Sequence, residues 1–124
     1  MYEIPTLETK TVKVETQVGK DSLLIRVVGA ITEQEPGKTL NPYFGSLHEA
    51  IQARGLNTVK LDLRQLTLVN SSGIVCILRW VKRVQQSTEK RYPIIIRYDP
   101  EILWQRISLK SLQMMAPDVV QVME

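Results

Sequence analysis

The sequence between Val59 and Gln86 changes its hydrophobic period once, and this change constrains the fold more than any other feature. From Val59 to Val69 apolar residues dominate an extended run, which predicts a strand in the middle of a sheet. From Ile74 to Gln86 apolar residues recur at helical spacing and predict a helix that packs on that sheet. The turn between them is Asn70-Ser71-Ser72-Gly73, which places two hydroxyl groups at a helix start, where a phosphate group can be accepted or bound.

Two strands are expected before this unit. The residues from Thr11 to Val18 alternate between apolar and polar side chains, a pattern typical of a half-buried strand. Gly19-Lys20-Asp21 supplies turn residues before a second apolar run, Leu23 to Val28, so we expect an antiparallel hairpin that closes at Gly29-Ala30. The polar segment from Thr32 to Thr39 predicts a loop of more than usual length.

A first helix is expected to begin at Asn41-Pro42. Asparagine caps free backbone amides, and proline at the first helical position sacrifices no hydrogen bond. The apolar residues Phe44, Leu47 and Ile51 then recur at helical spacing, and Gly55 is placed to end the helix in a left-handed conformation. This helix would connect the hairpin to the next strand.

The C-terminal part continues the alternation of strand and helix. Pro93 to Tyr98 is a β-branched run that predicts a strand, and Asp99-Pro100-Glu101 supplies the cap, proline and first-turn acid of a third helix. Asp118 to Met123 predicts a last strand at the edge of the sheet. The order predicts a single α/β domain over residues 1–124, with a mixed sheet of about five strands and three to four helices. In this sheet an N-terminal antiparallel hairpin is followed by parallel strands.

Composition argues against several classes of protein. The chain has 124 residues, 44% hydrophobic and 23% charged, as expected for one compact domain. No apolar run approaches the ~20 residues that span a bilayer, and the first residues do not form a secretory signal, so we expect a cytoplasmic protein without membrane insertion. The single cysteine, Cys76, excludes an intramolecular disulfide and a multi-cysteine zinc cluster, and is expected to serve packing. We expect no metal and no cofactor.

The charge of the chain is only mildly basic. Sixteen basic residues stand against thirteen acidic ones and give a net charge of +3, which argues against a nucleic-acid partner. The densest basic stretch lies on or just after the helix that follows the serine turn and comprises Arg79, Lys82, Arg83, Lys90 and Arg91. It is either a solvated helix face, with cations where the helix dipole favours them, or a docking face for an acidic partner.

The serine turn and its context resemble a known family. A strand with Leu61-Asp62-Leu63, a turn with Val69-Asn70-Ser71-Ser72-Gly73-Ile74 and a helix with Ile77-Leu78 are similar to a STAS domain of the anti-sigma-factor-antagonist type. In that family a strand ending in Asp-Ser-Ser-Gly, followed by a small apolar helix start, carries the regulatory serine. The similarity of element order extends from about Val12 to Met123.

The resemblance implies a role in protein interaction without catalysis. In the family, a serine kinase that is also an anti-sigma factor phosphorylates the second serine, a PP2C-type phosphatase removes the phosphate, and only the unmodified form holds the kinase. By position the phospho-acceptor here is Ser72, with Ser71 as the neighbouring possibility. The partner-binding surface implied by the resemblance is Asn70, Ser71, Ser72, Gly73 and Ile74. The oligomeric state is left open.

The chain departs from the family pattern at two places. Asn70 replaces the family's aspartate, which keeps the ability to cap amides but removes the carboxylate. The loop from Thr32 to Thr39 is longer than the compact turn of the family. These departures motivate an alternative function, a STAS-like scaffold or adaptor in a signalling or transport complex that is never phosphorylated.

Purely structural interpretations are kept beside the functional ones. Ser71 and Ser72 are alternatively plain N-cap residues, and Gly73 alternatively serves only tight packing. His48, the sole histidine, is expected at the surface or half-buried, and Asp62 at a strand end or satisfying a loop. Trp80 and Trp104 are expected to pack in the core or at its edge, with an interface role for Trp80 as the alternative.

A hydrolase is disfavoured by the residues around the turn. Ser72 has the strand-to-helix setting of a nucleophile elbow, but the glycine that precedes the nucleophile in that motif is missing. Only His48 is present to act as a histidine base. No Gly-rich phosphate loop ending in Lys-Ser/Thr is present either, so we expect no enzyme.

Overall fold

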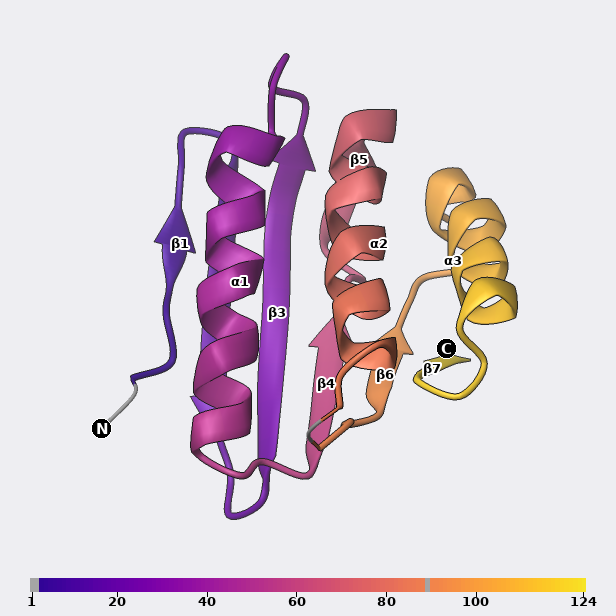
Figure 1. Ribbon diagram of the computed structural model, residues 1–124. Helices are drawn as coiled ribbons and strands as arrows, with labels where there is room; N and C mark the ends of the chain where they lie inside the picture. Colours follow the sequence, from indigo (N-terminus) through magenta and orange to yellow (C-terminus); the bar gives the residue numbers. More distant parts are fainter. Residues whose placement is uncertain (1–2, 89) are drawn as a thin grey trace.

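The computed structural model describes residues 3–88 and 90–124, which form a mixed sheet with helices packed on it (Figure 1). In these residues there are seven strands and three helices. The strands are β1 (Leu7–Glu8), β2 (Val12–Val18), β3 (Ser22–Ile31), β4 (Thr58–Asp62), β5 (Leu66–Val69), β6 (Ile94–Arg97) and β7 (Val120–Met123). The helices are α1 (Gly37–Ala53), α2 (Ser71–Gln85) and α3 (Leu103–Met115).

The sheet has the mixed topology that the element order predicted. Its strand order is β1-β2-β3-β4-β6-β7, and β5 also pairs with β3. The first three strands are antiparallel, whereas β3, β4, β6 and β7 run parallel to one another. The strand from residue 120 lies at the edge, as expected. The α/β class is therefore confirmed, with the two-residue strand β1 and the separate strand β5 added to the expected five.

The run from Val59 to Val69 is two strands, and the prediction of one continuous strand is wrong. The chain turns after Leu63, where the Leu66 amide donates to the Leu63 carbonyl at 2.9 Å. Both halves pair in parallel with β3, β4 along its first half and β5 along its end. A turn that keeps both halves on the same neighbouring strand preserves the apolar pattern, so periodicity alone does not reveal it.

The hairpin was predicted to close at Gly29-Ala30, but strand β3 continues to Ile31. The partner strand changes from β4 to β5 between Arg26 and Gly29, and the register of the pairing with β5 shifts between Gly29 and Ala30. Gly29 has a φ of +114°, and a Cβ there would lie 2.1 Å from the Thr11 carbonyl oxygen. Only glycine fits this position, where β3 passes close to the backbone of Thr11 and Val12.

Helix α1 begins at Gly37 rather than at Asn41, which corrects the expected start and shortens the preceding loop. Pro36 precedes the helix with a φ of −65°, and Pro42 lies inside it. Leu40 is buried in the core and extends the apolar side of the helix by one turn, which favours the earlier start. This start is adopted although Pro42 has no backbone N–H group to donate within the helix. The C-terminal end is confirmed, since Gly55 has a φ of +65°.

Helix α3 begins at Leu103, and Asp99 does not cap it. The Asp99 carboxylate instead accepts a hydrogen bond from the Glu101 amide at 3.0 Å, which makes a local turn before the helix. Gln105, fully buried, donates from Nε2 to the carbonyls of Leu63 and Leu66 at 2.5 and 2.9 Å. Helix α3 is thereby tied to the turn between β4 and β5.

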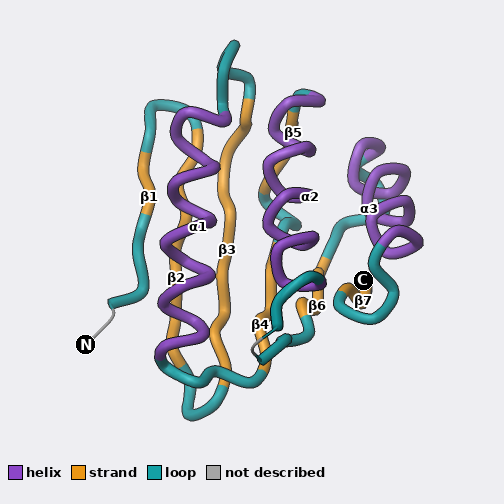
Figure 2. Tube along the Cα trace, viewed as in Figure 1, coloured by secondary structure: helices purple, strands orange, loops and turns teal. Residues whose placement is uncertain are grey.

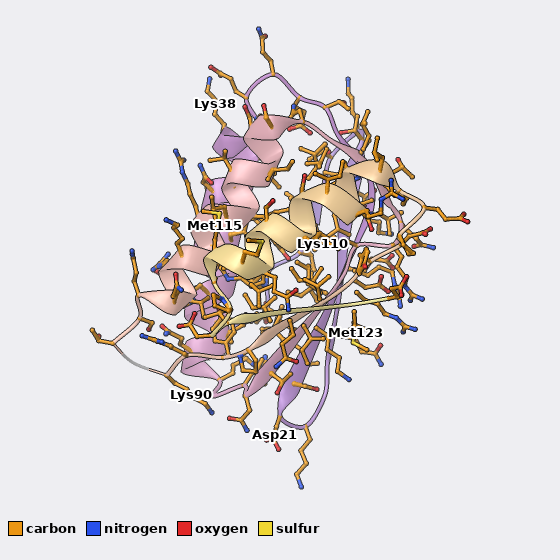
Figure 3. All side chains as sticks on the ribbon, turned by 90° about the vertical axis from the view of Figure 1, so that its right-hand side faces the viewer. Asp21, Lys38, Lys90, Lys110, Met115 and Met123 are labelled. Atoms are coloured by element: carbon orange, nitrogen blue, oxygen red, sulfur yellow. The ribbon has the colours of Figure 1, made fainter. Side chains whose placement is uncertain are left out.

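The helices α1 and α2 lie on the same face of the sheet, and α3 lies beside its β6–β7 edge (Figures 1 and 2). The core fills the space between this face and the helices, and its fully buried side chains include Leu23, Ile25, Leu47, Leu61, Ile94 and Ile96. Alternate residues of the strands point to the opposite face. We call this second side the uncovered face; in the side view of Figure 3, Met123 and Lys38 of α1 lie on opposite sides of the molecule.

Candidate partner-docking site

Asn70 organises the turn between β5 and α2. Its side-chain Oδ1 accepts a hydrogen bond from the Gly73 amide at 2.8 Å, which makes Asn70 the N-cap of α2. Its Nδ2 donates to the Glu33 carbonyl at 2.7 Å, and its backbone amide donates to the Ile31 carbonyl at 2.9 Å. One residue therefore holds together the helix start, the end of β3 and the loop before α1.

Asparagine at residue 70, where the resemblance leads us to expect aspartate, has a structural explanation. An ionised carboxylate accepts hydrogen bonds and donates none, so it would reproduce the cap to Gly73 but not the bond to the Glu33 carbonyl. The amide group of Asn70 does both. Asn70 is thus coupled to the loop that follows β3.

Ser71 and Ser72 are the first two residues of α2, and both are exposed. Neither is the N-cap, so the interpretation of the pair as plain capping residues is wrong. Among the described residues neither hydroxyl group makes a hydrogen bond. Because the first amides of a helix lack partners within it, the two hydroxyl groups lie at a positive helix end with accessible donors.

Gly73 and Ile74 join the turn to the core. Gly73 is buried, and a Cβ at this position would lie 2.7 Å from Cγ2 of Val69 and 2.8 Å from Cγ2 of Ile31. The tight-packing role proposed for this glycine therefore matches the structure. Ile74 is half-buried and packs against the core cluster. Of the expected docking surface, the two serines are exposed, whereas Gly73 supports them from beneath.

A groove of about 550 Å³ lies between α1 and α2 and is lined by His48 and Gln52 of α1 and by Arg79, Lys82 and Arg83 of α2. A smaller hollow of about 250 Å³ lies nearer the serine turn, beside Cys76. The described charged residues that line the groove are all basic, and Glu49 pairs with one of them, Arg83, at 3.7 Å. Lys82 and Arg83 also lie in the last turn of α2, where the helix dipole favours positive charge.

His48 is buried, which corrects the expectation of a surface or half-buried position. Its Nδ1 lies 2.6 Å from the Tyr92 hydroxyl oxygen, which also accepts a hydrogen bond from Trp80 Nε1 at 3.1 Å. The Trp80 ring stacks on Phe44 with 5.0 Å between the ring centroids. Burial raises the pKa of Tyr92, so its phenol stays neutral and serves this network. The position of His48, four residues after Phe44, was the sequence signal for its burial.

Other residues that carry chemistry have structural roles. Asp62 ends β4 and binds the amide and guanidinium of Arg64, as expected of a strand-end carboxylate. Cys76 is buried, and burial raises the pKa of its thiol, which fits a packing role. Trp80 is buried, and half-buried Trp104 donates to the Leu66 carbonyl at 3.1 Å.

Within residues 3–88 and 90–124, no group of three or more His, Cys, Asp or Glu side chains is arranged to hold a metal ion. No helix in these ranges is long and apolar enough to cross a bilayer.

Comparison with known proteins identifies the fold. No family model matches the chain, and no curated protein matches it significantly. An anti-sigma factor antagonist from Mycobacterium paratuberculosis is similar over 90% of this chain and 88% of its own, with a TM-score of 0.59 at 17% identity. A DUF3478-family protein from Shewanella loihica, with a SpoIIAA-like fold, is similar over 95% and 89%, with a TM-score of 0.57 at 14% identity. The chain therefore has the STAS, or SpoIIAA-like, fold that the turn motif predicted.

Proposed function

We propose that this chain is a non-catalytic protein-interaction switch similar to the anti-sigma-factor antagonists. Its partner is a serine kinase of the anti-sigma type, which docks on Asn70, Ser71, Ser72, Gly73, Ile74 and the start of α2. Phosphorylation of Ser72 releases this partner, and a PP2C-type phosphatase restores binding. The switch operates in the cytoplasm and needs no cofactor.

The observation that carries the proposal is the state of the two serines. Their hydroxyl groups are exposed and make no hydrogen bond with any described residue, while the backbone beneath them is fixed by Asn70 and Gly73. Phosphate adds roughly 1.5 to 2 negative charges. A helix N-terminus tolerates that charge, so modification changes the docking surface without unfolding the domain.

The cationic groove between α1 and α2 supports an acidic docking segment on the partner. Arg79, Lys82 and Arg83 line it, and all three belong to the same helix as Ser72. A phosphate on Ser72 would repel an acidic segment of the partner that extends to the start of α2. Charge repulsion across an interface costs several kcal/mol, which is enough to release a partner of ordinary affinity.

The test compares matched aspartate variants. The partner is first isolated from the protein's own cells with the unmodified chain as bait, then purified, and its Kd is measured against the parent, Ser72→Asp and Ser111→Asp. Ser111 is an exposed serine of α3, beside the far edge of the sheet. We expect Ser72→Asp to bind about tenfold more weakly or worse and Ser111→Asp to bind like the parent. Equal binding by all three proteins would remove the switch from the proposal.

The second candidate is a STAS-like scaffold or adaptor that is never phosphorylated. It is favoured by one observation, the absence of a carboxylate at residue 70, where the amide group is committed to Glu33 and Gly73. If that carboxylate takes part in recruiting the kinase, Asn70→Asp will gain phosphorylation that the parent lacks. The same result would assign the scaffold role to the native chain.

A further inference from the structure

The uncovered face of the sheet has a depression of about 340 Å³ over β3, β4 and β6. Its apolar floor is formed by Leu24, Ile95 and Met123. Leu24 and Ile95 are half-buried and Met123 is 51% exposed. This volume lies within the range of small-molecule sites, which is roughly 300 to 1,000 Å³. We call it the basic depression, because its surroundings are cationic.

Among the described residues, Asp62 is the one acid that lines the basic depression, and four cations line it: Arg26, Lys60, Arg64 and Arg97. Asp62 holds Arg64 in a two-point contact, with Nε–Oδ1 and Nη2–Oδ2 distances of 3.0 and 2.8 Å. It also lies 3.6 Å from Arg26 Nε. One carboxylate therefore serves two guanidinium groups, and three positive charges remain in excess around an apolar floor.

Lys60 and Arg97 are the cations that remain available. Neither makes an ion pair with any residue that the structure describes. Lys60 lies opposite Ile95 in the pairing of β4 with β6, and Arg97 lies two residues after Ile95 on the same face of β6. Two free cations thus flank the same apolar side chain, which is the arrangement that binds a carboxylate with a hydrocarbon part.

The charge of this face also excludes a second copy of the chain as its occupant. Two such depressions placed face to face would bring their excess cations together without compensation. Acidic side chains limit the cationic area, since Glu15 lies opposite Arg26 in the pairing of β2 with β3. A long polyanion needs an extended cationic surface, whereas this one is confined to the size of a small molecule.

We propose that the basic depression binds a small amphipathic carboxylate of the medium-chain fatty-acid type. Its hydrocarbon part lies on Leu24, Ile95 and Met123, and its carboxylate pairs with Lys60 and Arg97. Arg64, held by Asp62, borders the site and keeps it positive. The proposal does not depend on Ser72 or on a partner protein, because the depression lies on the face of the sheet opposite α1 and α2.

The probe for the test is decanoate, titrated into the ¹⁵N-labelled chain while amide NMR signals are followed. Decanol and decyltrimethylammonium are compared at the same concentrations, because they keep the hydrocarbon chain and remove or reverse the charge. We expect decanoate to shift the signals of Leu24, Lys60, Ile95 and Arg97 with saturation, and the other two probes to shift them little. Equal shifts with all three probes, or shifts centred on α1 and α2, would overturn the proposal.

The matched variants are the double change Lys60→Gln with Arg97→Gln, and Lys82→Gln on α2 as the control. Neither Lys60 nor Arg97 holds another described side chain, so the double variant is expected to fold, and its NMR spectrum checks this. Loss of charge-assisted hydrogen bonds should weaken decanoate binding by about ten- to a hundredfold. Unchanged binding by the folded double variant, or no saturable binding by the parent, would contradict the proposed site.

Discussion

At the scale of single residues, Asn70 explains most about the candidate site. It caps α2 through Oδ1 and anchors the Glu33 carbonyl through Nδ2. A side chain that must donate and accept hydrogen bonds at the same time needs an amide group. This requirement accounts for asparagine at the position where the family that the chain resembles has aspartate. The capping role of Asn70 was foreseeable from its place before a helix. The bond to Glu33 was not, because it joins residues that are 37 positions apart.

Replacing Asn70 by aspartate tests this explanation. The variant loses the bond to Glu33 and brings a carboxylate against a carbonyl oxygen, which costs about 1 to 3 kcal/mol. The negative charge of a carboxylate at the helix N-terminus stabilises the protein by only about 0.3 to 1 kcal/mol through the helix dipole. We therefore expect a net loss of stability. The free energy of unfolding by urea measures it, with Asn57→Asp as the control at an exposed position. An Asn70→Asp protein as stable as the parent would refute the role given to Nδ2.

Asp62 makes stability depend on pH at the acidic end. Its hydrogen bonds with the Arg64 side chain lower the pKa of Asp62 below the usual value of about 3.9. A lowered pKa in the folded state stabilises the protein above the usual value, and this stabilisation is lost as the pH falls through the folded-state pKa.

We therefore expect the free energy of unfolding of the parent to decrease as the pH is lowered below about 4. The decrease should be less steep in Asp62→Asn, which has no carboxylate to protonate at this position. The measurement is urea unfolding at several pH values for both proteins. Parallel pH curves for parent and variant would show that Asp62 does not contribute.

At the scale of elements, the contact between α2 and the sheet depends on Gly73. A methyl group there would meet Val69 and Ile31 at less than 3 Å, and both belong to strands that cannot move apart cheaply. Gly45 of α1 is a useful contrast, because a methyl group there would meet only the flexible end of Arg83, at 3.3 Å. The same substitution is thus expected to have opposite signs at the two positions.

Gly73→Ala should lower the free energy of unfolding by about 1 to 3 kcal/mol through overpacking. Gly45→Ala should raise it by about 0.5 to 1 kcal/mol, because alanine is favoured over glycine inside a helix. Thermal and urea unfolding of both variants provide the measurement. Equal changes in the free energy of unfolding for the two variants would show that helix propensity, and not the contact beneath α2, determines the effect of Gly73→Ala.

Element boundaries were harder to predict than element types. The end of α1 at Gly55 follows from a local signal, the left-handed glycine. The start of α1 depends on tertiary packing of Leu40, which outweighs the strong local signal of Asn41-Pro42. The turn inside the run from Val59 to Val69 is likewise set by β3, which offers both halves a pairing edge.

At the scale of the whole molecule, the sheet separates two surfaces. The side covered by α1 and α2 carries the serine turn and the cations of α2, and both follow from contiguous sequence. The basic depression on the other face combines Arg26, Lys60 and Arg97 from three strands, and only the pairing register brings them together. The first surface was therefore predictable from local pattern, and the second was not.

The central claim is that Ser72 is a regulated phospho-acceptor, and phosphopeptide mass spectrometry of the protein from its own cells tests it most directly. Trypsin is expected to release the peptide Gln65–Arg79, whose hydroxyl groups belong to Thr67, Ser71 and Ser72. Fragment ions between the two serines then assign the site. We predict phosphate on Ser72 with an occupancy that differs between growth and stress. Full coverage of this peptide without phosphate in either condition would contradict the switch and leave the unmodified scaffold.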